Sequence, residues 1–409
     1  MPENYFEKHR KVSNIEEARR AREERYNPQK PMPKSHLKSK AQKKSDDFTL
    51  LFVIILLLLF GLVMVFSSSY YLALTSSRFN NDMYYFVNRQ LMWSVLGIAG
   101  MFVMMHVNYR ILKNFTLIGY LAILGCLILV LFVGNEYNGG RRWLGIPNST
   151  IGFQPSEIAK FVIIVCLAHY ISRNKNCLST FKEFCKCSLI WAVPTALIAV
   201  ENLSTAIVVA GISVCMMFVA SPVIWYFVAL AGAGVAGIVT MVAMPQFAYR
   251  IDRITYWLDP FSDPTHKGFQ IIQGLYAVAS GGLFGLGLGQ SRQKTYLPEP
   301  YNDMIFAIIC EELGMVGAFI ILLLFGVFIW RGAKIAMNAQ DVFGCLIAAG
   351  MTALIGIQVI INVAVATNSM PNTGMQLPFI SYGGSGLFFT LVGMGILLNV
   401  SKFQKNTNK

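Results

Sequence analysis

The sequence predicts an all-α integral membrane protein of about ten transmembrane helices, with a large extracytoplasmic loop between helices 7 and 8. Of its 409 residues, 55% are hydrophobic and 13% are charged, and the mean hydropathy is +0.52. A soluble domain carries roughly 25% charged residues. The net charge of +13 comes from Lys and Arg in the N-terminal tail and in short connections between apolar segments. That distribution is typical of a membrane protein and excludes nucleic acid as a partner.

Ten apolar segments approach the length of about 20 residues that a helix needs to cross a bilayer. The first one lacks the small-residue cleavage site of a signal peptide, so we expect it to remain as an anchor. The basic connections place both termini in the cytoplasm. The segments are 48–67, 89–106, 115–134, 156–171, 188–201, 204–220, 223–244, 303–330, 342–365 and 383–400.

The chain divides into a tail, a membrane domain and a second short tail. Residues 1–47 hold thirteen basic and eight acidic side chains and too few apolar ones to form a core, which predicts a flexible cytoplasmic tail. Residues 48–400 form the ten-helix domain, with 245–302 as its large outer loop, and 401–409 form a cytoplasmic C-terminal tail. The stretch 268–289 is apolar enough for an eleventh span. An eleventh span would place the basic C-terminus outside. The glycines and glutamines of this stretch also favour a broken, interfacial or re-entrant segment.

Eight cysteines lie in apolar segments or in the connection 172–187. Cys185 and Cys187 form a lone pair with no nearby histidine, so the spacing does not indicate a metal site. We expect free thiols.

Two predicted outer segments are unexpectedly basic. Arg141 and Arg142 are adjacent in 135–155, and the loop 245–302 carries five more cations, including Lys294. Long loops cross a membrane regardless of charge, which is one interpretation. The other is recognition of an anionic group at the outer leaflet, for which the planar guanidinium suits phosphate oxygens.

Acidic side chains stand at the outer ends of two predicted helices. Glu157 and Lys160 are three residues apart and share a helix face, either as a structural pair or as part of a site. Asp303 opens the segment 303–330, where a helix N-terminus favours its anionic form. Glu311 and Glu312 lie roughly 12–13 Å deeper, at about 1.5 Å per residue, which predicts a structural pairing or a neutral form.

A third outer loop, "SMPNTGMQLPFISYGGSG" at 369–386, contains Ser381, Gly383 and Gly384. Glycines permit backbone shapes that present N–H groups to an anion, although the same letters also suit a simple turn. With the basic segments and Asp303, this loop indicates chemistry on a lipid phosphate or pyrophosphate outside the cytosol. The sequence contains no Walker loop, HExxH motif or histidine cluster.

At these motifs the sequence resembles the SEDS family (shape, elongation, division and sporulation: FtsW, RodA, SpoVE). The matching strings are "GRRWLGIP", "GFQPSEIAKF", the stretch from "DPTHKGFQ" through "YNDMIFAIICEELG", and "LPFISYGGSG", within a match over 48–400. The resemblance implies a SEDS-type fold of ten helices in the bacterial cytoplasmic membrane. It also implies a peptidoglycan glycosyltransferase that polymerises lipid II at the outer face, and a class B penicillin-binding protein as partner.

The resemblance assigns the essential aspartate to Asp303. In an inverting transfer, the acceptor hydroxyl attacks the anomeric carbon of the donor, and one carboxylate suffices as the base. Arg141, Arg142, Lys160 or Lys294 would stabilise the departing pyrophosphate, with or without a divalent cation (Mg²⁺ or Mn²⁺). Glu299 would position the loop or the acceptor. Glu157, Ser381, Gly383 and Gly384 complete the expected substrate-binding set.

One feature of the sequence departs from the family pattern, and two others favour one subgroup of the family. Many members read Pro-Asp-Leu-Gly after the fifth span, where this chain reads "ENLSTA" at 201–206. "VFSSSYY" and the basic tail favour an FtsW-like role in septal synthesis and the division machinery over RodA-like or SpoVE-like roles in elongation or sporulation. A lipid II flippase and a non-catalytic division scaffold are the competing functions.

Overall fold

The computed structural model describes residues 47–137, 140–145, 152–174, 178–221, 223–243 and 248–404. Of the predicted tail 1–47, only Asp47 lies within the described residues, and the predicted tail 401–409 is described as far as Gln404. The seven cysteines in the described part are all free, as expected, while Cys177 lies outside it.

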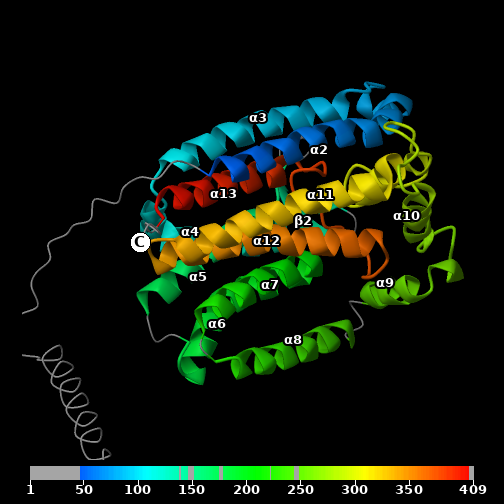
Figure 1. Cartoon of the computed structure of the whole chain (residues 1–409). Coiled ribbons are helices and arrows are strands. Elements are labelled where there is room, and N and C mark those ends of the chain that lie inside the picture. The colour runs from blue at the N-terminus through cyan, green and yellow to red at the C-terminus, as the bar shows by residue number, and fades with distance from the viewer. Residues whose placement is uncertain are drawn as a thin grey trace, which may run out of the picture. The chain divides into compact units, whose positions relative to one another are not determined.

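Each of the ten predicted spans corresponds to one helix (Figure 1). Within the described residues, nine helices are long and apolar enough to cross a membrane. Helix α8 corresponds to the remaining predicted span, but its apolar part, Trp225 to Gly237, is shorter than the other nine. The ten are α2 (Phe48–Thr75), α3 (Tyr85–His106), α4 (Leu112–Val133), α5 (Pro155–Arg173), α6 (Phe181–Glu201), α7 (Leu203–Ala220), α8 (Trp225–Ala243), α11 (Ile305–Asn338), α12 (Val342–Ala366) and α13 (Gly384–Lys402). The protein is a multi-pass helical membrane protein.

The helices pack so that α11 contacts α2 and α12, α13 lies along α3, and α12 contacts α5 and α7 (Figure 1). Small residues allow the closest of these approaches. A Cβ on Gly97 of α3 would lie 2.5 Å from Leu391 Cδ1 of α13, and one on Gly395 would lie 2.4 Å from the Met101 carbonyl oxygen. Close backbone approach at small residues is the usual way that membrane helices gain packing energy.

The connections between the spans contain short ordered elements. Three strands lie between α4 and α5: β1 (Asn135–Tyr137), β2 (Gly140–Gly145) and β3 (Gly152–Phe153). They pair in the order β1-β2-β3, antiparallel throughout, and Glu136 is the register partner of Arg141. The large loop between α8 and α11 holds α9 (Ala248–Leu258), η4 (Pro260–Ser262), α10 (Phe269–Ser280) and η5 (Gln293–Thr295).

The stretch 268–289 is broken, as predicted. Helix α10 has only 12 residues, and a turn follows in which Gly282, Gly285, Gly287 and Gly289 all have positive φ. At about 1.5 Å per residue, α10 covers roughly 18 Å, too little to cross a bilayer.

Helix α11 differs from the predicted continuous span, because Gly314 breaks it with φ 68° and ψ −171°. The break removes helical partners from the carbonyls of Glu311 and Glu312. The glycine turn supplies replacements: Leu286 N donates to Glu311 O over 2.9 Å and Gly287 N to Glu312 O over 3.0 Å. In return, Met315 N donates to Gly282 O over 3.0 Å. The two broken segments thus satisfy each other's backbone groups, which a membrane interior requires.

Candidate active site

Asp303 lies in the turn that precedes α11, two residues before its first residue Ile305. The sequence predicted that Asp303 opens the helix, whereas the helix begins two residues later. Three hydrogen bonds hold this turn in place. Asn362 Nδ2 of α12 donates to Asp303 O over 2.8 Å, and Ser381 Oγ donates to Asn302 O over 2.6 Å. The third runs from Tyr382 N to Tyr301 O over 2.9 Å.

The environment of the Asp303 carboxyl favours its neutral form. Its pKa is raised from the ordinary 3.8 to about 6, mainly by burial, and the neighbouring charge of Glu299 acts in the same direction. Hydrogen bonds from the backbone and from the Gln270 side chain act in the opposite direction. Asn372 Nδ2 donates to Gln270 Oε1 over 2.9 Å, so the glutamine is itself held. A carboxyl with a pKa near neutrality suits proton transfer.

Glu299 is held beside this turn in a strained conformation. Its φ of +48° lies in the left-handed region, which non-glycine residues adopt rarely and at a cost of about 1–3 kcal/mol. Asn302 Nδ2 donates to Glu299 Oε2 over 3.2 Å, and Gln376 Nε2 donates to Asn302 Oδ1 over 2.9 Å. Glu299 is therefore linked through Asn302 to the loop that precedes α13.

The loop before α13 packs closely on that glutamine. A Cβ on Gly383 would lie 2.5 Å from Gln376 Oε1, and one on Gly384 would lie 2.9 Å from Trp93 Nε1. The φ of Gly383 is −164°, so close approach, and not a left-handed backbone, is what requires glycine there. The Gly383 N–H donates to Gln90 Oε1 over 3.3 Å. This N–H therefore has a partner within the protein.

Ser381 also makes its described contacts inside the protein. Its hydroxyl accepts from Leu377 N over 2.8 Å while it donates to Asn302 O. Gln90 Nε2 donates to the Ser381 carbonyl over 3.1 Å. These bonds join the loop to the turn that carries Asp303.

Glu157 and Lys160 form the ion pair that their spacing predicts, with Lys160 Nζ 2.7 Å from Glu157 Oε2. The lysine side chain is only 2% exposed, and that of the glutamate is 19% exposed. A Cβ on Gly386 would lie 3.2 Å from Glu157 Oε2 and 3.6 Å from Gln376 Oε1, so the pair lies near the same glutamine. Glu299, Ser381 and Gly383 are thus linked through Asn302 and Gln376 to the turn that carries Asp303, whereas Glu157 and Gly384 contact other residues.

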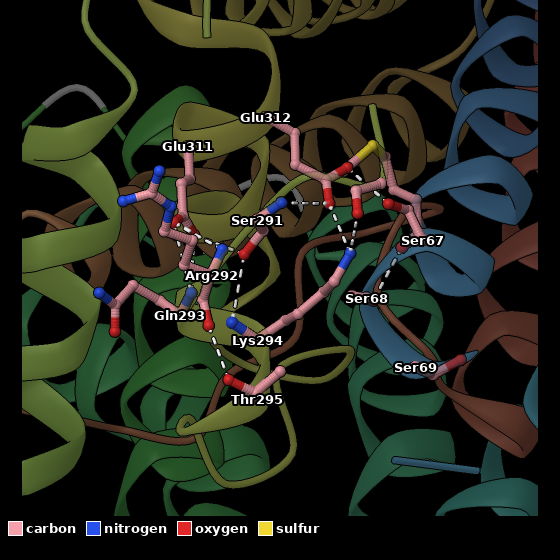
Figure 2. Close-up of polar contacts among 12 residues, drawn as sticks. Ser67, Ser68, Ser69, Ser291, Arg292, Gln293, Lys294, Thr295, Glu311 and Glu312 are labelled. Atoms are coloured by element: carbon pink, nitrogen blue, oxygen red, sulfur yellow. Dashed lines mark hydrogen bonds and ion pairs between the residues drawn. The ribbon is translucent and has the colours of Figure 1, made fainter. Parts of the chain in front are cut away.

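Lys294 lies in a different cluster (Figure 2). Its Nζ donates to Gly289 O over 2.6 Å and to Glu312 Oε1 over 3.3 Å. Glu311 and Glu312 are fully buried; Glu312 pairs with Lys294 and Glu311 accepts from Ser291, which agrees with the prediction of a structural pairing or a neutral form. Contact of Lys294 with a pyrophosphate would require these bonds to break.

Arg141 and Arg142 occupy neighbouring positions of β2, and the structure describes only their backbone. The departure at 201–206 falls at the junction of α6 and α7. There Asn202 Oδ1 accepts from Thr205 N over 3.1 Å and caps α7. An amide or carboxylate oxygen serves equally as such a cap.

Sequence reasoning missed the uncharged members of the site, which are Gln90, Gln270, Asn302, Asn362 and Gln376. Each is an amide in or beside an apolar helix or a glycine-containing loop, and a polar side chain at such a place needs a partner. The sequence therefore shows that each amide needs a hydrogen-bond partner, but it does not show which group that partner is.

The described residues contain no group of three or more His, Cys, Asp or Glu side chains that could hold a metal ion. Asp303 and Glu299 are neighbouring carboxyl groups, and one or two carboxylates with substrate phosphates are a usual environment for Mg²⁺. Two carboxyl groups alone do not make a metal site in the described residues, so a cation would have to arrive bound to the phosphates of a substrate.

The fold and the site together define a polytopic membrane protein with a cluster of polar side chains assembled at the ends of its helices. The chain belongs to the cell cycle protein family FtsW/RodA/SpoVE, whose family model matches residues 48–406.

Named relatives agree with this assignment. Stage V sporulation protein E of Bacillus subtilis is 42% identical over 330 residues, covering 80% of this chain and 89% of the relative. "Probable peptidoglycan glycosyltransferase FtsW" of Geobacter sp. strain M18 is 37% identical, covering 80% and 90%.

Solved structures share the fold. A structure described as "Structural coordination of polymerization and crosslinking by a peptidoglycan synthase complex" has a TM-score of 0.73 and 26% identity, covering 88% of this chain and 99% of the other. The rod shape determining protein RodA of Thermus thermophilus has a TM-score of 0.65 and 25% identity, covering 88% and 98%.

Proposed function

We propose that this protein is an inverting peptidoglycan glycosyltransferase that polymerises lipid II into glycan strands, with Asp303 as the general base. The observation that carries the proposal is the Asp303 carboxyl, whose pKa is raised to about 6 and which follows Glu299 in the family's most specific string. Relatives named as peptidoglycan glycosyltransferases support the reaction class.

The transfer is a single displacement. The 4-hydroxyl of the acceptor sugar attacks the anomeric carbon of the donor, and Asp303 takes the hydroxyl proton as the new C–O bond forms. The bond from the anomeric carbon to the pyrophosphate breaks, and the polyprenyl pyrophosphate leaves with the electron pair. General-base help of this kind typically contributes 10²–10⁴-fold.

The remaining predicted residues receive supporting roles. Arg141, Arg142 and Lys160 would stabilise the departing pyrophosphate, which matches the charge-assisted hydrogen bonds that cations make with phosphate oxygens. A divalent cation bound to the phosphate oxygens of the substrate would add charge stabilisation to the departing pyrophosphate. Glu157 keeps Lys160 in place through their ion pair, at 2.7 Å.

The loop before α13 would shape the acceptor site. Ser381 holds the turn around Asp303, Gly383 attaches the loop to Gln90 of α3, and Gly384 lets the loop lie against Trp93. Glu299 would orient the acceptor and keep the base at a high pKa.

We propose a bacterial cytoplasmic membrane location with both termini in the cytoplasm and the loop 245–302 outside. Tail 1–47 and tail 401–409 would then face the cytoplasm. Labelling from outside is expected to reach cysteines introduced near the outer loops and to miss one in the connection 172–187. The positions are Asn148, Thr265 and Asn372 for the outer set and Lys175 for the inner control. External labelling at position 175 would contradict this topology.

The proposed partners are lipid II as donor and acceptor, the surrounding membrane lipid and a class B penicillin-binding protein of the division machinery. The structural likeness to a peptidoglycan synthase complex supports a partner of that kind. Septal synthesis is the favoured duty. The 42% identity to a sporulation protein makes a sporulation-type polymerase the second candidate.

The deciding experiment supplies purified full-length protein with lipid II and separates the products by gel. Glycan strands from the wild type, and none from Asp303→Asn, are expected. Transport of lipid II across vesicles without any polymer would instead support a flippase.

A further inference from the structure

Five polar side chains form a buried cluster away from Asp303, which we call the docking cluster: Ser67, Ser291, Lys294, Glu311 and Glu312 (Figure 2). Each is at most 5% exposed. They come from α2, from the segment after α10 and from the first half of α11. The transfer reaction described above uses none of them directly.

Glu312 joins all three of these elements. It accepts from Ser67 Oγ of α2 over 2.5 Å and from Lys294 Nζ over 3.3 Å. Figure 2 shows its carboxylate between these two side chains. Glu311 accepts from Ser291 Oγ and from Arg292 N, the latter over 2.9 Å. Two adjacent glutamates of α11 thus hold the segment 291–294.

The glycine turn adds a backbone attachment at the same place. Leu286 and Gly287 donate to the carbonyls of Glu311 and Glu312, as described above. A Cβ on Gly285 would lie 2.4 Å from the carbonyl carbon of Glu312, so the turn has no room to shift toward the helix. Side chains and backbone therefore fix one stretch, 282–294, against α11.

The fixed stretch leads directly to the site. Leu297 N donates to Gln293 O over 2.9 Å, and Asn302 N donates to Glu299 O over 3.0 Å. The connection from Lys294 to Asp303 begins at a residue that Glu312 of α11 holds, and it ends two residues before α11 begins. Glu299 lies within this connection, so a displacement of Lys294 would also displace Glu299.

We propose that the docking cluster is a positioning device that holds Glu299 and its loop against Asp303, an inference that rests on the proposed function. A buried ion pair adds little net stability compared with apolar side chains of similar volume, whereas its geometry can impose one arrangement. Undocking of the segment admits water to Asp303 and moves Glu299 away. Both changes favour the ionised carboxyl.

Other charged groups also stand on the elements around Asp303, and the test has to keep them unchanged. Glu299 is the neighbour whose charge raises the pKa of Asp303. The others are Arg253 on α9, Asp263 and Lys267 before α10, and Glu157 with Lys160 on α5.

The test measures polymerisation of lipid II against pH for the full-length protein and for Ser67→Ala. Removal of one buried hydroxyl should leave the protein folded. We expect kcat to fall by about tenfold to a hundredfold, the range for slight misplacement of a catalytic group. We also expect the acidic limb of the profile to move to lower pH. Lys294→Met should also lower kcat and move the acidic limb to lower pH. If Lys294 only bound pyrophosphate, its replacement would raise KM and leave the acidic limb in place.

The matched control is Asp47→Asn, because Asp47 joins the same two helices at their other end. Asp47 Oδ2 lies 2.5 Å from Arg331 Nη2 of α11, and Asp47 Oδ1 also caps α2 at Leu50 N. Asparagine keeps the cap and loses the ion pair. We expect Asp47→Asn to lower Tm and to leave the acidic limb of the pH profile of polymerisation at its wild-type position.

The outcomes separate this proposal from the proposed function. Near-normal polymer from Asp303→Asn would overturn the proposed function. Loss of polymer in that variant, with an unmoved acidic limb in Ser67→Ala, would overturn the positioning role alone. If Lys294→Met does not fold, Ser67→Ala decides the question by itself.

Discussion

Replacement of Asp303 by asparagine should abolish catalysis and stabilise the protein at the same time. Asparagine has nearly the size of aspartate and keeps one acceptor oxygen, so the turn before α11 should form. It cannot take a proton from the acceptor hydroxyl at neutral pH. We expect polymerisation to fall by about 10²–10⁴-fold.

The stabilisation follows from the raised pKa. The carboxyl titrates near 3.8 when the chain is unfolded and at about 6 in the fold. Below pH 3.8 it is neutral in both states, and folding carries no penalty from its charge. As the pH rises from 3.8 to 6, the unfolded state loses its proton first, and stability falls. Above pH 6 the full penalty is present, on the order of 2–3 kcal/mol at about 1.4 kcal/mol per pH unit.

The assay compares Tm of the wild type and Asp303→Asn at pH 4 and pH 8, alongside glycan synthesis from lipid II. The variant should melt at a higher temperature at pH 8, and the two curves should converge at pH 4. A variant that is inactive but less stable than the wild type at pH 8 would indicate a structural aspartate. Substantial polymer from the variant would refute the base assignment outright.

Further predictions concern the cations, the charge beside the base and the glycine turn. Arg141→Ala or Arg142→Ala should reduce polymerisation without loss of folded protein, because each removes a charge-assisted contact worth about 1.5–3 kcal/mol; unchanged rates in both and in the double variant would make them ordinary loop charges. Glu299→Gln should move the acidic limb of kcat/KM to lower pH, since it removes a negative charge that raises the pKa of the base. Gly285→Ala should lower Tm, because a side chain there is both strained and 2.2 Å from the Glu312 carbonyl oxygen. Gly232→Ala, with nothing within 4 Å, is the control, and an equal loss of Tm there would remove the explanation.

The sequence by itself determined the membrane spans and several local features. Segment length and apolar composition respond directly to the thickness and chemistry of the bilayer, so the nine membrane-crossing helices of the described residues were predictable, and the tenth predicted span is the shorter apolar helix α8. The Glu157–Lys160 pair was predictable because three residues separate neighbours on one helix face. The break in 268–289 was predictable from its glycines.

Only the tertiary structure decided which distant groups meet. Ser67 and Glu312 are 245 positions apart, and no local pattern relates them. The partner of Lys294 is likewise set by how α11 is broken at Gly314, and that break is stable only because the glycine turn supplies the missing backbone partners. Gln376 donates both to Asn302 and to the Tyr382 carbonyl, and no local sequence pattern relates Gln376 to Asn302. Periodicity records whether a position faces lipid or protein, whereas the identity of a buried polar partner depends on the packing of whole helices.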